Sequence, residues 1–295
     1  MELFELMECS VKYDSDVGVV YVAFGRPFLA MALLSAKMLR ESNRDIPFTI
    51  VSNVTASIEN FSFFESSDRY IFISEETEDN RLIKTSINKY SNYRKTLYLD
   101  CDTQVVGSLT PIFDAMERFD LAIHLKARRY KRSPYDLEPV FNGHPANALP
   151  HWNGGVFFFN DSPEAKDFFA KWNSLFTHGG LSIDQISLAQ AIYASNARVL
   201  ALDARWNSAL LPKDVDHDVV IYHYTSSFDD SILRDLCLMD SSVVDPVVDV
   251  ELDLSEFFAL RRGERHQKDL KRWRERRAAK SARRRGKFLS LFRRR

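Results

Sequence analysis

The chain alternates between short apolar runs rich in β-branched residues and longer amphipathic stretches. Residues 17–24 are continuously apolar, as expected for a strand that is covered on both faces. Residues 26–41 follow, with Pro27 in the first turn and leucines at helical spacing. Two further short apolar runs lie at 46–51 and 70–73. The order strand, helix, strand predicts a parallel sheet layered with helices.

The same alternation continues through most of the chain. Helices are predicted at 79–90, 109–117, 163–176 and 183–195, and strands at 96–99, 119–123, 156–159, 199–202 and 219–222. Residues 126–150 are polar and basic without periodicity, which is typical of a functional lid or an insertion. The pattern therefore predicts one α/β domain over residues 1–245 and a helical tail over residues 246–295.

The most informative polar positions directly follow the predicted strand at 96–99. Asp100 and Asp102 flank Cys101, and residues two apart in an extended chain project to the same side. Two carboxylates held together repel each other unless a cation or a shared proton lies between them. Open α/β sheets also bind ligands at the carboxyl ends of their strands. We therefore expect a divalent metal here, with an ordinary acidic turn as the alternative.

His223 is the candidate for a third metal ligand. It follows the apolar run at 219–222, so we expect it where a parallel sheet presents its ligands. An imidazole nitrogen beside two carboxylates favours Mn²⁺ over Mg²⁺, which prefers oxygen ligands. A structural histidine at a strand end is the alternative.

Two more motifs contain residues suited to ligand contact. Gly154 and Gly155 precede an aromatic run, and paired glycines let a backbone approach a ligand closely, although a tight turn explains them equally well. Asp184 and Gln185 open a predicted helix. There, Ser182 and Gln185 form a capping box, which is compatible with a contact to substrate.

In this order and spacing, the four motifs resemble those of glycosyltransferase family 8, among the GT-A-fold nucleotide-diphospho-sugar transferases. The matching segments are LYLDCDTQVVGSL at 97–109, NGGVFFFN at 153–160, DQISLAQAI at 184–192 and IYHYTSS at 221–227. The resemblance implies a GT-A (Rossmann-like) fold, with a mixed, mostly parallel sheet flanked by helices. It also implies a metal-dependent transfer of a sugar from a nucleotide-diphosphate donor, with a UDP-sugar as the first expectation, to an acceptor that the sequence does not identify.

The resemblance also implies roles for individual residues. The expected ligands of the metal, Mn²⁺ or Mg²⁺, are Asp100, Asp102 and His223. The residues expected to contact the nucleotide-sugar are Ala23, Phe24, Arg81, Lys84, Asp100, Asp102, Asn153, Gly154 and Gly155. Asp184 resembles the residue that binds the hydroxyls of the donor sugar, and Gln185 the polar group on the reactive face, so these two are the expected catalytic residues. The Trp206-Asn207 pair resembles a loop motif of related transferases to which the resemblance assigns no role.

The chain departs from the family pattern after His223. Family members usually continue into a Lys-Pro-Trp segment whose lysine touches the diphosphate, whereas residues 226–230 read Ser-Ser-Phe-Asp-Asp. A basic group from residues 126–132 is the candidate substitute.

The net charge of −1 is the sum of two unequal parts. Residues 261–295 contain 17 Lys or Arg and three acidic residues, a net charge of +14, whereas the other 260 residues sum to −15. A basic, helix-favouring segment that carries Trp273, Leu291 and Phe292 suits the surface of an anionic membrane. Binding to nucleic acid and a merely solvated helix are the alternatives, and nucleic acid is the weaker expectation.

The remaining composition favours a cytoplasmic protein. The three cysteines form neither a disulfide framework nor a metal-binding spacing, so a reducing compartment is the simpler interpretation. No apolar run is long enough to span a membrane, and the N-terminus lacks the pattern of a secretory signal. We therefore expect a cytoplasmic location with peripheral membrane association through the basic tail.

Three other functions are compatible with parts of the pattern. A haloacid-dehalogenase-type phosphatase also has Asp-x-Asp after a strand, but it has Thr or Val where this chain has Gln104. A nucleotidyltransferase would have a Gly-rich, Lys-containing loop after its first strand, which residues 25–27 do not provide. A non-catalytic module that uses the transferase fold and binds membrane or nucleic acid through the tail also remains open.

Overall fold

The structure is a computed structural model. It describes residues 13–56, 61–74, 80–126, 140–141, 144–145, 150–178, 184–208 and 218–224. The basic tail, residues 127–132 and 226–230, and Ser182 lie outside these ranges, so the predicted domain boundary after residue 245 and the capping box at Ser182 stay predictions.

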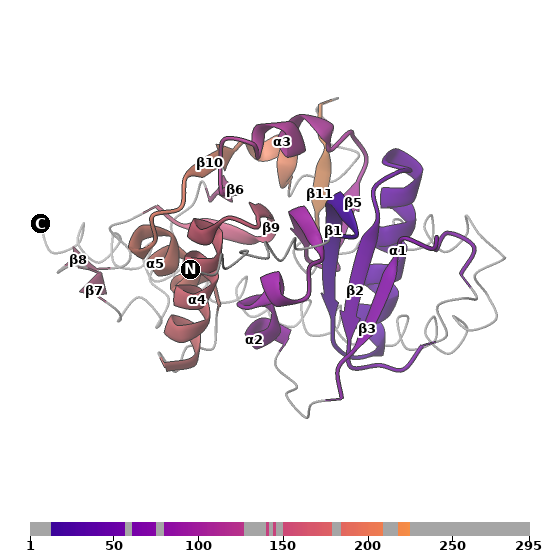
Figure 1. Ribbon diagram of the computed structural model, residues 1–295, viewed down its shortest axis with the longest axis horizontal. Coiled ribbons are helices and arrows are strands. Elements are labelled where there is room, and N and C mark those ends of the chain that lie inside the picture. The colour runs from indigo at the N-terminus through magenta and orange to yellow at the C-terminus, as the bar shows by residue number, and fades with distance from the viewer. Residues whose placement is uncertain are drawn as a thin grey trace, which may run out of the picture. The chain divides into compact units, whose positions relative to one another are not determined.

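Seven strands form one mixed sheet in the order β10-β6-β9-β4-β1-β2-β3 (Figure 1). The strands are β1 Ser15–Ala23, β2 Phe48–Ser52, β3 Arg69–Phe72, β4 Tyr93–Leu99, β6 Leu121–Leu125, β9 Trp152–Asn160 and β10 Val199–Leu202. All pairs in this sheet are parallel except those of β9, which is antiparallel to both β4 and β6. The prediction of a mixed, mostly parallel sheet is confirmed.

Helices connect the strands near the predicted positions. They are α1 Arg26–Ser42, α2 Asn80–Lys84, η2 Ile87–Lys89, α3 Thr110–Ala115, α4 Pro163–His178, α5 Asp184–Ala194 and η5 Ala204–Trp206. The continuous helix predicted at 79–90 is wrong, because α2 ends at Lys84 and a 3₁₀ turn follows. The hydroxyls of Thr85 and Ser86 donate to the carbonyls of Leu82 and Ile83, and this local bonding competes with helix continuation.

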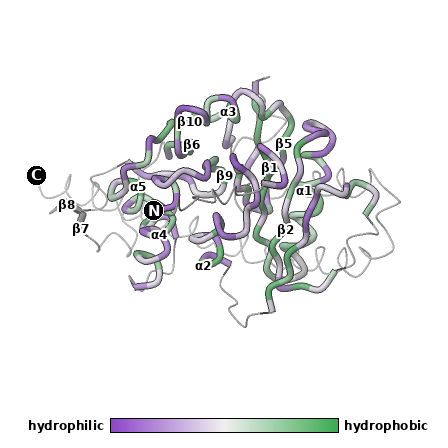
Figure 2. The backbone as a smooth tube through the Cα atoms, viewed as in Figure 1, coloured by the Kyte–Doolittle hydropathy of each residue, from purple (hydrophilic) through white to green (hydrophobic). Residues whose placement is uncertain are grey.

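Hydrophobic residues cover both faces of the sheet. Phe157 and Phe158 are neighbours in β9 and therefore point to opposite faces. The ring of Phe157 packs against Trp172 of α4 at a centroid distance of 5.7 Å, and the ring of Phe158 packs against Phe113 of α3 at 5.4 Å. Helices α2, α4 and α5 thus share one face of the sheet, while α1 and α3 share the other. Figure 2 shows the hydrophobic strands β1 and β2 beside α1.

A second, two-stranded sheet lies outside the main one. It consists of β5, Thr103–Val105, and β11, Ile221–His223, which run antiparallel with His223 opposite Thr103. We predicted the run at 219–222 as a strand of the main sheet, and that assignment is wrong, because β11 instead pairs with the short strand that follows Asp102. A further pair joins β7, Val140–Phe141, and β8, His144–Pro145.

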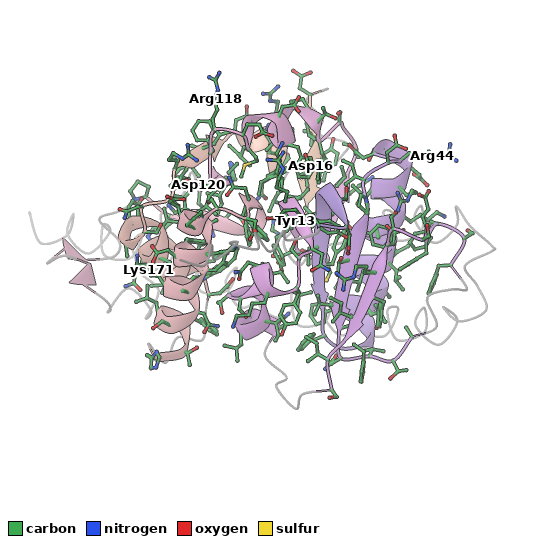
Figure 3. The ribbon with its side chains drawn as sticks, viewed as in Figure 1. Tyr13, Asp16, Arg44, Arg118, Asp120 and Lys171 are labelled. Atoms are coloured by element: carbon green, nitrogen blue, oxygen red, sulfur yellow. The ribbon has the colours of Figure 1, made fainter. Side chains whose placement is uncertain are left out.

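An ion pair between Arg198 and the buried Asp120, which is labelled in Figure 3, joins the starts of the edge strand β10 and its neighbour β6. The carboxylate of Asp120 accepts the backbone N–H of Arg198 at 2.8 Å and its guanidinium at 2.9 Å. The guanidinium holds the pKa of Asp120 at about 2. By contrast, Arg44 and Arg118 are exposed and project from the surface in the same view. Within the part of the chain that the structure describes, no helix is both long and apolar enough to cross a membrane.

Candidate active site

The two aspartates of the Asp-x-Asp motif lie in a tight turn between β4 and β5. The turn is fixed by three hydrogen bonds, from Thr103 Oγ1 to the carbonyl of Asp100 at 2.8 Å, from Tyr224 N–H to the carbonyl of Asp102 at 2.9 Å, and from Asp100 N–H to the carbonyl of Gly155 at 2.7 Å. The side chain of Cys101 is buried and points away, with Sγ 3.2 Å from the carbonyl of Val22. The carboxylates therefore share one side because of this turn, and not because of the extended backbone that the sequence suggested.

Asp100, Asp102 and His223 converge at the carboxyl end of β4. One ligand atom from each lies within 4.8 Å of the others. His223 Nε2 is 3.3 Å from Asp102 Oδ1 and 3.8 Å from Asp100 Oδ2. The sequence correctly predicted that these residues come together, but His223 reaches the site on the β5–β11 pair and not on a strand of the main sheet.

The paired glycines lie inside β9, so their interpretation as a turn before the strand is wrong. A Cβ atom placed on Gly155 would overlap Cε1 of His223 and would lie 2.8 Å from Asp100 Oδ2. The backbone at Gly155 thus forms one wall of the carboxylate–imidazole cluster, and a side chain there would fill the cluster. Asn153 supports this wall, because its Oδ1 accepts the N–H of Gly155 at 2.9 Å. Gly154 has more room, with Leu188 Cδ2 3.0 Å from a Cβ placed there.

A buried lysine links the acidic turn to helix α5. Lys84 Nζ lies 2.9 Å from Asp100 Oδ1 and 3.4 Å from Asp184 Oδ2. It also lies 4.9 Å from the ring centroid of Tyr98, whose hydroxyl donates to Asp100 Oδ1 at 2.8 Å. Burial alone would lower the pKa of Lys84, but the charges of Asp100 and Asp184 outweigh burial and raise it above its ordinary value. Of the two predicted basic residues, Lys84 is in the cluster, whereas Arg81 is exposed on α2.

Asp184 and Gln185 occupy the first turn of α5, next to Lys84. The carbonyl of Asp184 accepts hydrogen bonds from Trp172 Nε1 at 3.2 Å and from Ser187 Oγ at 2.9 Å, so the start of the helix is held in place. Asp184 Oδ2 is buried and forms an ion pair with Lys84 Nζ at 3.4 Å. Gln185 Oε1 accepts a hydrogen bond from Lys126 Nζ at 3.3 Å.

Ala23 and Phe24 lie at the carboxyl end of β1, next to β4 in the sheet. Both are buried, and Ser52 Oγ donates to the carbonyl of Ala23 at 2.6 Å. Since the thiol of Cys101 donates a hydrogen bond to the carbonyl of Val22, the end of β1 adjoins the acidic turn. This position agrees with the rule that ligands bind where strand order reverses in an open sheet, and a contact between these two residues and a nucleotide stays a prediction.

The structure adds two residues that the sequence did not single out as site residues. Tyr98 lies beneath Lys84, and its pKa is well above the ordinary value because of burial and the charge of Asp100. Asn207 is buried and its Oδ1 is 2.9 Å from His223 Nδ1. The Trp206-Asn207 pair was the available sequence signal for Asn207. For Tyr98 there was none, because an aromatic residue in an apolar strand is an ordinary core residue.

The comparisons with known proteins agree with this arrangement. The family model described as glycosyl transferase family 8 matches residues 49–228, more than half of the chain. No curated protein sequence matches the chain significantly. Among solved structures, the galactosyltransferase LgtC in complex with donor and acceptor sugar analogs superposes with a TM-score of 0.58 at 14% identity, over 79% of this chain and 99% of that chain.

Two larger proteins share the same fold. The glycosyltransferase GlyE of Streptococcus pneumoniae TIGR4 superposes with a TM-score of 0.52 at 18% identity, over 82% of this chain and 64% of that chain. The bifunctional glycosyltransferase WbbM gives a TM-score of 0.51 at 14% identity, over 72% of this chain and 46% of that chain. With the GT-A fold of the main sheet and the match to the family model, the chain belongs to glycosyl transferase family 8 and is a glycosyltransferase.

Proposed function

We propose that this glycosyltransferase is metal-dependent and transfers a sugar from a nucleotide-diphosphate donor, with a UDP-sugar as the first candidate, to an acceptor still to be identified. The convergence of Asp100, Asp102 and His223 at the end of β4 carries the proposal. It is the site where an open α/β sheet binds its ligands, and it lies within the residues matched by the family model.

The residues present fit a divalent cation. Two carboxylates and one imidazole face one another, and the absence of a side chain at Gly155 leaves the space between them open. A nitrogen ligand beside two carboxylates favours Mn²⁺ over Mg²⁺. When bound, the ion would supply a positive charge that stabilises the diphosphate leaving group.

The neighbouring residues fit the binding of the donor sugar. Lys84 stays charged and holds the carboxylates of Asp100 and Asp184 in fixed positions. A carboxylate oxygen accepts more than one hydrogen bond, so the buried Asp184 Oδ2 can accept one from a sugar hydroxyl besides its contact with Lys84. We assign Asp184 to the sugar and Gln185 beside it to the reactive face, with Asn153 and Gly154 on the acceptor side.

We propose Lys126 as the replacement for the lysine that the family carries after its histidine. Its ammonium lies 3.3 Å from Gln185 Oε1, and its backbone N–H donates to the carbonyl of His151 at 2.8 Å. These contacts place a positive charge next to the residue assigned to the reactive face. Lys126→Met should therefore weaken donor binding, whereas Lys126→Arg should preserve it.

Calorimetric titration of UDP- and GDP-sugars, with and without Mn²⁺, tests the proposal. Wild type should bind one donor in a Mn²⁺-dependent manner, and Asp102→Ala should not bind it. Arg118→Ala, an exposed residue after α3, is the control and should behave as wild type. Donor binding that is unaffected by both Mn²⁺ and Asp102→Ala would contradict the metal-dependent mechanism. No binding to any donor by a folded protein would favour the non-catalytic alternative.

We further propose a cytoplasmic enzyme whose residues 261–295 bind an anionic membrane. The charge of +14 in this segment supports the proposal. Deletion of residues 261–295 should abolish co-sedimentation with phosphatidylserine-containing vesicles and leave donor binding unchanged. Vesicle binding that survives the deletion would contradict it, and salt-sensitive affinity for nucleic acid in place of vesicles would favour the alternative partner.

A further inference from the structure

Asn207 is held in place by backbone pairing on both sides. The N–H of Val220 donates to the carbonyl of Arg205 at 2.9 Å, and the N–H of His223 donates to the carbonyl of Ser208 at 2.7 Å. The segment from η5 to Ser208 therefore runs alongside β11, the strand that carries His223. Trp206 anchors this segment by packing edge-on against Phe158 at a centroid distance of 6.0 Å. Asn207 and His223 thus belong to one rigid unit.

The side chain of Asn207 contacts His223 through its oxygen. Oδ1 lies 2.9 Å from Nδ1 of the buried imidazole. An amide oxygen only accepts hydrogen bonds, so a hydrogen bond between these two atoms requires the proton on Nδ1. In the neutral ring, Nε2 then has a lone pair that faces Asp102 Oδ1 at 3.3 Å, and two such acceptor atoms repel each other unless a cation lies between them.

The amide nitrogen of Asn207 helps to distinguish a structural role of this residue from a role at the site. Asn207 Nδ2 is buried and has no hydrogen-bond partner among the described residues. Because a buried unsatisfied donor is costly, Asn207 contributes less to stability than a fully hydrogen-bonded asparagine would. Among the described residues, the hydrogen bond that the side chain of Asn207 makes is the one to His223 Nδ1.

We infer that Asn207 is a positioning residue that fixes His223 in the Nδ1–H tautomer and keeps Nε2 available as a ligand of the divalent metal. The inference rests on the proposed metal-dependent function. Through His223, Asn207 sets the preference of the site for Mn²⁺ over Mg²⁺, because the nitrogen ligand is what distinguishes the two ions. Hydrogen-bond partners of metal-bound histidines typically affect metal affinity about 10- to 100-fold.

The first test compares three proteins by the binding of Mn²⁺ alone. Asn207→Leu has a similar volume and cannot accept a hydrogen bond, whereas Asn207→Asp keeps an acceptor oxygen. Calorimetry should show Mn²⁺ affinity about 10- to 100-fold weaker in Asn207→Leu and close to wild type in Asn207→Asp, with a smaller change in Mg²⁺ affinity. Electron spin-echo spectra of the bound Mn²⁺ should show the histidine ¹⁴N coupling in wild type and Asn207→Asp and lose it in Asn207→Leu. Wild-type affinity and an intact ¹⁴N signal in folded Asn207→Leu would overturn the inference.

The second test needs no variant of Asn207 to fold. In wild-type protein with ¹⁵N-labelled histidine, long-range ¹H–¹⁵N spectra report the tautomer of each ring, and His223→Gln identifies the relevant signals. A proton on Nδ1 of His223 supports the inference, and a proton on Nε2 alone overturns it. If wild type retains the Nδ1–H tautomer but binds no Mn²⁺, or binds it equally well as Asp102→Ala, the proposed metal function fails and the assigned role of Asn207 fails with it. If wild type binds Mn²⁺ and Asp102→Ala does not, while folded Asn207→Leu binds it as tightly as wild type, only the role of Asn207 fails.

Discussion

Replacement of Gly155 by alanine should disable the metal site while leaving the fold intact. A Cβ atom at this position would overlap His223 Cε1 and would lie 2.8 Å from both His223 Nδ1 and Asp100 Oδ2. Ordinary contact begins at 3.4 Å, so the carboxylate would have to move by about 0.6 Å and the imidazole by more. Neither can move easily, because Asn207 holds His223 and the N–H of Asp100 is bonded to Gly155 itself.

The expected magnitude follows from this displacement. Misplacing a reacting or ligating group by about 1 Å costs about 100-fold in rate, and overpacking of a tight site costs about 1–3 kcal/mol in stability. Gly155→Ala should therefore lose about 100-fold or more in Mn²⁺-dependent sugar transfer, measured as release of nucleotide diphosphate from the donor. Its Mn²⁺ affinity should fall in parallel, and urea denaturation should show a loss of stability in the stated range.

Gly18→Ala is the matched control. A Cβ atom at Gly18 would overlap the ring of Tyr93, so the steric conflict is comparable. Tyr93 starts β4 and Asp100 follows its last residue, so this conflict lies about 20 Å from the acidic turn. Gly18→Ala should lose stability but keep wild-type Mn²⁺ affinity in the folded protein. Wild-type activity and Mn²⁺ affinity in Gly155→Ala, or an equal loss of affinity in both variants, would refute the reasoning.

Three further predictions follow from the charges. Lys84→Met leaves the carboxylates of Asp100 and Asp184 without their cation, so it should destabilise the fold by about 3 kcal/mol at pH 7 in urea denaturation and weaken donor binding. Because folding raises the pKa of Lys84, the contribution of this lysine to the free energy of unfolding is present below about pH 10 and is lost as the pH rises through the folded pKa. A Lys84→Met variant that is as stable as wild type at pH 7 would contradict this prediction. Asp120→Asn should lower the free energy of unfolding by about 2 kcal/mol at pH 7. Because Arg198 lowers the pKa of Asp120, this difference from wild type should disappear as the pH falls from about 4 to 2. A difference in stability that does not depend on pH would refute this prediction. Removal of divalent metal with EDTA should abolish donor binding in calorimetry, and added Mn²⁺ should restore it; binding that persists in EDTA would count against the metal.

The local pattern was sufficient for most of the elements and for the acidic pair. Strands β1, β4 and β9 contain apolar runs at residues 17–23, 97–99 and 156–159, and such runs are recognisable because both faces of the sheet are covered. Asp100 and Asp102 stand out because charged residues directly follow one of these runs. The choice between Arg81 and Lys84 was beyond the pattern, since residues three apart on a helix share a face. Only tertiary contacts show that Lys84 is buried against Asp100.

The arrangement of β5 and β11 could not be predicted for a different reason. β5 is only Thr103–Val105, too short for a period to be visible, and its partner lies more than 100 residues later. Nor does an aromatic run reveal strand direction, so the antiparallel placement of β9 was equally hidden. The antiparallel placement of β9 brings the backbone of Gly155, an interior residue of this strand, directly beside His223. Long-range pairing, and not local propensity, therefore determines which side chains complete the proposed metal site.

The charges brought together by this pairing explain why we expect the site to require a cation. Asp100, Asp102 and Asp184 contribute three carboxylates, and within the described part of the cluster the ammonium of Lys84 offsets one of them. A nucleotide-diphosphate donor would add further negative charge to a site that is already negative. Like charges at these separations are strongly unfavourable unless a counter-ion lies between them. The same geometry that positions the carboxylates for a metal therefore opposes binding of the donor without one.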